Sequence, residues 1–236
     1  MWTYLVILAS LSMLLGVFVR RLFIAYKGNS PAVETIAEVV EEVLEKTEKI
    51  SAADKKAIAI LCEKADIKAK TGNDDEAIKL LVQALALDKF HVEAQHRLAL
   101  LYMGKQMYNS AAALFESLGK ITDDPVHYSH LGLALYQQGD TESARGAYQK
   151  AISLDSSRPQ RFVSLSQVYR SLGQLQHSII ALNKALELDN ENLDFLFLLS
   201  DLQVELVNVD EAKEILKKIL SIDKDNIDAK KLLKSL

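Results

Sequence analysis

Small and large hydrophobic residues recur along the chain at a fixed interval. The stretch GDTESARGAYQKAISLD begins at Gly139, and GQLQHSIIALNKALELD begins 34 positions later at Gly173. Each has a small residue five positions after its glycine and a large apolar residue four positions further on. Spacings of three and four place such residues on one side of an α-helix, so the pattern predicts a chain built from repeated amphipathic helices.

The interval divides most of the chain into units of similar length. Five units cover residues 58–226, and the last ten residues form a predicted capping helix at 227–236. The units are 58–91, 92–124, 125–158, 159–192 and 193–226. The small column is Ala77, Ala111, Ala144, Ser178 and Ala212; the large column is Leu81, Phe115, Tyr148, Leu182 and Leu216; and a third column holds Ala84, Leu118, Ala151, Ala185 and Ile219.

Turn-forming residues separate two helical segments within the units. Gly72, Gly139 and Gly173 lie between the segments, and Pro125 and Pro159 open their units. A small residue on the second helix lets the first helix approach closely, and the large residue one turn later fills the space beside it. One helix pair cannot bury its apolar stripe alone, so the pattern predicts an all-α array in which neighbouring pairs stack.

The first helix of each unit has columns of its own. A small residue recurs in all five units, and the position three residues later is aromatic in two of them. The small residues are Ala65, Ala99, Gly132, Ser166 and Ser200; the later position holds Lys68, Tyr102, Leu135, Tyr169 and Gln203. Over residues 58–226 this combination resembles the tetratricopeptide repeat. The resemblance implies a right-handed superhelix of antiparallel helix pairs.

The first twenty-seven residues form a separate region. Residues 2–19 contain no charged side chain, and Arg20 and Arg21 follow directly. A helix over residues 2–26 can cross a bilayer, which makes residues 1–27 a predicted transmembrane anchor. The positive charges after the span place the N-terminus outside and the repeats in the cytoplasm. The alternative is a cleaved signal peptide on an exported protein, although the positive charge then stands at the wrong end.

Residues 28–57 are predicted to form a linker and an amphipathic helix. The helix spans about residues 31–49, because apolar side chains recur at spacings of three and four while six glutamates face elsewhere. Two roles are open for it. It packs against the end of the array, or it forms a homo-oligomer through residues 31–50.

The composition and motifs argue against several classes of function. A net charge of −4 offers no basic surface for nucleic acid. The single cysteine, Cys62, cannot form an internal disulfide or a multi-thiolate metal site. The sequence has no phosphate-binding loop, nucleophile elbow, dinucleotide fingerprint or zincin motif. His127 and His130 lack a third metal ligand at a suitable spacing. We therefore expect no enzymatic activity, no cofactor and no metal.

The resemblance implies a protein-binding groove lined by the first helices of successive units. The family's clamp for chaperone tails requires Lys, Asn and Arg at positions where this chain has Glu63, Asp66, Glu93, Leu100 and Val126, so that partner is not implied. Arg97, His130 and Arg170 are expected to receive some acidic partner, and the two arginines are expected to face solvent. The predicted groove residues are His96, Arg97, Leu100, His130, Leu133, Tyr136, Gln137, Gln167 and Arg170.

The predicted function is a membrane-anchored scaffold that presents this groove to the cytoplasm. Tethering raises the local concentration of recruited proteins and so favours further binding events. The alternatives are a self-associating structural component of a membrane complex and an exported repeat protein.

Overall fold

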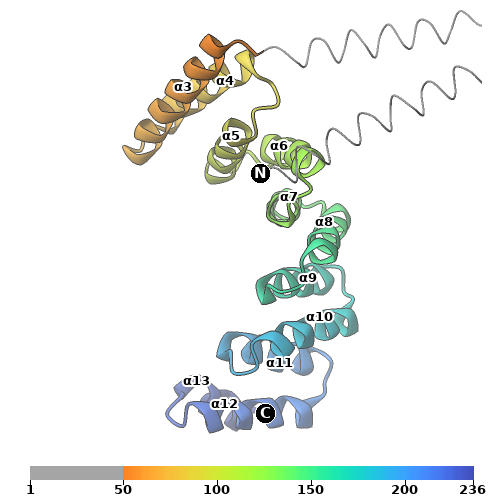
Figure 1. The fold of residues 1–236 in the computed structure, drawn as a ribbon. Coiled ribbons are helices and arrows are strands. Elements are labelled where there is room, and N and C mark those ends of the chain that lie inside the picture. Colours follow the sequence, from red (N-terminus) through yellow and green to blue (C-terminus); the bar gives the residue numbers. More distant parts are fainter. Residues whose placement is uncertain (1–49) are drawn as a thin grey trace, which may run out of the picture. The chain divides into compact units, whose positions relative to one another are not determined.

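The computed structural model describes residues 50–236, which form eleven α-helices and no strand (Figure 1). Ala52–Leu236 is one compact unit. No helix within this unit is long and apolar enough to span a membrane. The predicted membrane span and the predicted helix at 31–49 lie outside the described residues.

The helices form successive pairs, and each pair has a first helix and a second helix. Each helix packs against the next along the chain, and the first helices α7 and α9 also touch. The first helices are α3 (Ala52–Lys70), α5 (Val92–Gly104), α7 (Pro125–Gln138), α9 (Pro159–Ser171), α11 (Leu193–Glu205) and the C-terminal α13 (Ile227–Ser235). The second helices are α4 (Asp74–Leu87), α6 (Tyr108–Thr122), α8 (Thr141–Leu154), α10 (Leu175–Leu188) and α12 (Val209–Ile222). Because α3 begins at Ala52, residues 52–57 of the predicted linker segment belong to the first helix.

Capping residues and turns explain where the helices begin and end. At the start of α7, the Asp124 carboxylate accepts a 2.7 Å hydrogen bond from the Val126 backbone N–H, and Pro125 occupies the first turn. The turn from α7 to α8 has Gly139 at φ 93°, which glycine adopts without a Cβ clash. At the matching turn between α11 and α12, Val207 has φ 61°. A β-branched residue is strained in that conformation.

The core follows the columns that the sequence predicts. All five members of the small column have no exposed surface, and Phe115, Leu182 and Leu216 of the large column are equally buried. The buried Ser178 hydroxyl is satisfied because it donates a 2.8 Å hydrogen bond to the Ser166 carbonyl oxygen. A Cβ at Gly132 would lie 2.9 Å from the Tyr148 ring, so the glycine lets α7 and α8 pack closely. The all-helical repeat architecture predicted from the sequence is therefore confirmed.

Candidate protein-binding site

Helix α7 presents two opposite faces in the middle of the array. His130, Leu133 and Gln137 are spaced by three and four residues, so they lie along one side of the helix. Tyr128, Leu131 and Leu135 lie along the other side, at about 180° from the first set by the 3.6-residue period. The side with Leu133 belongs to the first surface described below, and the side with Leu131 and Leu135 belongs to the second.

The first surface combines one exposed position from each of three successive first helices. Leu100, Leu133 and Gln167 each follow the small residue of their own helix by one position, and all three are exposed. Leu100 is 42% exposed and Leu133 is 38% exposed. We call the surface around these three residues the first-helix face. Its centre is apolar, while the same position in α3 and α11 holds Asp66 and Asp201.

The two arginines predicted for the groove are bound to carboxylates of the chain itself. Arg97 forms an ion pair with Glu93 and a 2.7 Å ion pair with Asp66 of the preceding first helix. Its guanidinium also donates a 3.0 Å hydrogen bond to the Cys62 carbonyl oxygen. Only 27% of the Arg97 side chain is exposed. The sequence predicts that Arg97 faces solvent, whereas the side chain is mostly covered, is paired with two carboxylates and ties α3 to α5.

Arg170, two repeats further along the array, is paired with a carboxylate of the following first helix. Its Nε donates a 2.9 Å hydrogen bond to Glu205 of α11, and this bond raises the pKa of Arg170. Nearby, the Tyr136 hydroxyl and Ser171 Oγ share a 2.8 Å hydrogen bond that links α7 to α9. A partner carboxylate would have to displace Glu205 to reach Arg170. The arginine is therefore a link between repeats and not a free anion receptor.

Three histidines gather around Phe115 where α5, α6 and α7 meet. The His96 ring lies 5.3 Å from His127 and 6.0 Å from His130, measured between ring centroids. His130 stacks on Phe115 at 5.0 Å. His127 Nδ1 is 2.8 Å from Thr122 Oγ1. These contacts make the cluster part of the packing between repeats.

The surroundings of His127 and His130 favour neutral imidazoles. Burial lowers the pKa of both His127 and His130, and the neighbouring His96 lowers each further. The lowered pKa favours uncharged His130 near neutral pH, which makes it less suited to the acidic partner expected from the sequence. No group of His, Cys, Asp or Glu side chains within residues 50–236 is arranged to hold a metal ion.

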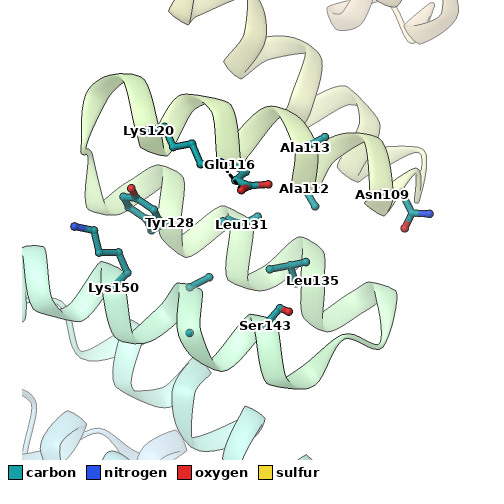
Figure 2. Close-up of a pocket in the computed structure, with 12 residues that line it drawn as sticks. Asn109, Ala112, Ala113, Glu116, Lys120, Tyr128, Leu131, Leu135, Ser143 and Lys150 are labelled. Atoms are coloured by element: carbon teal, nitrogen blue, oxygen red, sulfur yellow. Dashed lines mark hydrogen bonds and ion pairs between the residues drawn. The ribbon is translucent and has the colours of Figure 1, made fainter.

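The second surface is a groove that the sequence analysis did not identify (Figure 2). It has a volume of about 550 Å³ and runs between second helices α6 and α8, with the Leu131 and Leu135 side of α7 contributing to its lining. We call it the α6–α8 groove. Its walls include four small residues: Ala112 and Ala113 on α6, and Gly146 and Ala147 on α8.

A signal for the α6–α8 groove is present in the sequence. Two positions after the small column, the other three units carry Lys79, Ile180 and Glu214, whereas the central units carry Ala113 and Gly146. Long side chains at this position would extend over the space between second helices. The break in the column predicts an opening, but only once the stacking of the units is known.

Three segments of the chain match models of the tetratricopeptide repeat: residues 58–91, 128–158 and 173–236. The chain is a tetratricopeptide-repeat protein. Among solved structures, the tetratricopeptide-repeat array is similar to MamA, with a TM-score of 0.69 and 23% identity over 74% of this chain and 96% of that chain. A MamA structure from Desulfovibrio magneticus RS-1 gives a TM-score of 0.66 and 17% identity, covering 72% of this chain and 97% of that chain.

YrrB, described as a tetratricopeptide-repeat protein with an unusual peptide-binding site, is also similar. Its TM-score is 0.64 and its sequence identity is 20%, and the match covers 80% of this chain and 100% of that chain. At these identities the likeness establishes the fold alone. No curated protein sequence matches the chain.

Proposed function

We propose that this tetratricopeptide-repeat protein is a protein-interaction scaffold that binds a partner segment along its first-helix face. The observation that carries the proposal is the exposure of Leu100 and Leu133 at one repeated position of adjacent first helices. Exposed apolar side chains in register provide anchor points for a segment lying across several repeats. Peptide binding by the similar protein YrrB supports the same kind of function.

The chemistry of the first-helix face favours a segment with an apolar centre. Leu100 and Leu133 offer apolar contacts, and Gln137 and Gln167 offer amide groups beside them. The two arginines predicted for the groove, Arg97 and Arg170, are already paired with carboxylates. We therefore infer a partner segment held by apolar side chains and by hydrogen bonds from its backbone, and not an acidic tail.

A photo-crosslinking amino acid on the first-helix face tests this function. Placed at Leu133, it should capture the partner, because that side chain is exposed at the centre of the proposed surface. Placed at Ile180 on α10, which is 59% exposed, it should not. Capture from residue 180 and not from residue 133 would assign the partner to another surface.

We further propose that residues 2–26 anchor the scaffold in a membrane, with the repeats in the cytoplasm. The uncharged stretch from residue 2 to residue 19 and the arginines that follow it support this arrangement. A reporter fused after Leu236 should then show cytoplasmic activity. Activity of an export-dependent reporter at that position would favour the exported form.

Self-association through residues 31–50 is a further way to cluster the scaffold, and sedimentation of the chain with and without that segment tests it.

A further inference from the structure

We propose that the α6–α8 groove is a second docking surface, which receives an acidic partner segment that inserts an apolar side chain between the two helices. This surface lies on the side of α7 opposite to His130 and Leu133. It is therefore separate from the first-helix face, and one array can hold two partners at once. Its volume of about 550 Å³ lies within the range of about 300–1,000 Å³ that is usual for ligand pockets.

The interior of the groove suits an apolar side chain. Leu131 and Leu135 lie along α7, and the alanines and Gly146 form walls without long side chains. The neighbouring pair α8 and α10 differs, because longer side chains interact there. The Gln149 side-chain amide donates a 3.0 Å hydrogen bond to the Tyr169 hydroxyl, and the His177 ring lies 5.3 Å from that of Tyr169.

Gly146 is the residue that most directly opens the groove. It lies inside α8, and no atom of another residue would come within 4 Å of a Cβ added there. The packing of the fold therefore does not require a glycine at this position. Its consequence is an accessible stretch of helix backbone, which a partner side chain can approach closely.

The charges at the rim specify an acidic partner. Lys120, Tyr128 and Lys150 gather toward one end of the groove, whereas Asn109 and Ser143 lie toward the other (Figure 2). Lys150 Nζ stands 5.5 Å from the centre of the Tyr128 ring. The lining itself holds two lysines and one glutamate, Glu116, while Asp123, the partner of Lys150, is not among its residues. This end complements carboxylates that flank an apolar anchor.

The lysines have partners in the chain, but these contacts can be exchanged. Lys120 pairs with Glu116 at 2.6 Å, and Lys150 pairs with Asp123 at 3.2 Å. Both pairs are exposed to solvent, where an ion pair contributes little to stability. A partner carboxylate can therefore replace Glu116 or Asp123 at small cost. Arg97 of the first-helix face differs, because it is mostly covered and tied to two helices.

Subtractive selection of displayed random peptides on residues 50–236 tests the proposal. This fragment contains the whole compact unit with its own core. Peptides are first depleted on the Gly146→Leu variant, which adds a large side chain whose Cβ meets no other residue within 4 Å, and then selected on the unchanged fragment. We expect the recovered peptides to carry Asp or Glu beside a large apolar residue. Their affinity should fall about tenfold or more for Gly146→Leu, as for loss of a central contact, and for Lys120→Glu with Lys150→Glu.

Two control variants separate docking from effects on folding. Gly146→Ala adds a side chain too small to fill the groove and should keep the peptide affinity within about threefold, since the alanine walls are equally small. Leu133→Glu, on the opposite side of α7, should also leave it unchanged. Recovery of no peptide that depends on Gly146 would overturn the proposal. Recovery of peptides without acidic residues would overturn the assigned chemistry.

Discussion

Replacing Phe115 with alanine should lower the free energy of unfolding of residues 50–236 by about 3–5 kcal/mol, the range for large-to-small changes in a core. Phe115 has no exposed surface and packs with Ala99, Leu118 and Leu131 where three helices meet. Its removal leaves a cavity and takes away the ring on which His130 stacks. Urea unfolding followed by circular dichroism measures the change.

Ile180→Ala is the matched control for this variant. Ile180 is 59% exposed on α10, so its loss should change the free energy of unfolding by no more than about 0.5 kcal/mol. An equal effect of the two substitutions would contradict the burial of Phe115. It would also contradict the register in which the large column faces the core.

Acidification from about pH 7 to pH 5 should destabilise the array by up to about 1.4 kcal/mol per pH unit for each histidine held neutral. Burial lowers the pKa of His127 and His130 in the folded state, so the folded chain binds fewer protons than the unfolded chain. The stabilisation that comes from the neutral histidines is fully present above the pKa of histidine in the unfolded chain, about 6.5. It declines as the pH falls below that value toward the folded pKa.

Other titrating groups contribute to the dependence of stability on pH. Asp124 acts against the shift of His127, while burial and His96 produce it. Asp155 contributes to the pH dependence of stability only at a much lower pH, because the hydrogen bond that it accepts from Arg161 holds its pKa far below the usual value. Unfolding measured at several pH values should therefore show a first loss of stability between about pH 6.5 and pH 5.

His130→Phe provides the test of this assignment. Phenylalanine preserves an aromatic ring against Phe115 but cannot bind a proton, so the variant should show a weaker dependence of stability on pH. An identical dependence in the two proteins would place the titrating groups elsewhere.

The sequence predicts the repeat architecture because each helix pair is specified by local spacing. Ala144 and Tyr148 lie one turn apart, and this spacing alone places both against the first helix. Gly139 and Pro125 mark the turn and the helix start by their backbone preferences. Such signals act over a few residues and can be identified from one chain.

The details of the site depend on contacts between units, which local spacing does not specify. The ion pair from Arg97 to Asp66 and the one from Arg170 to Glu205 each join side chains more than thirty positions apart, 31 and 35 respectively. Arg161 illustrates the same limit. It is 5% exposed and binds Asp155 and Ser129, although an arginine in a helix is usually expected at the surface.

The α6–α8 groove also depends on contacts between units. Ala113 and Gly146 are 33 positions apart and are unremarkable on their separate helices. The opening exists because stacking brings these two small residues to opposite walls of one space. A search for positions where a repeat column changes from long to small side chains would have identified it.

The central claim is that a partner protein contacts the first-helix face, and the site of contact can be measured directly. A photo-crosslinking amino acid at residue 133 in the full chain, activated in cells, should give a crosslinked product, and peptide mapping should place the link at α7. The same amino acid at residue 180 should give none, although Ile180 is the more exposed side chain. A product from residue 180 with none from residue 133 would contradict the assignment of the first-helix face as the binding surface.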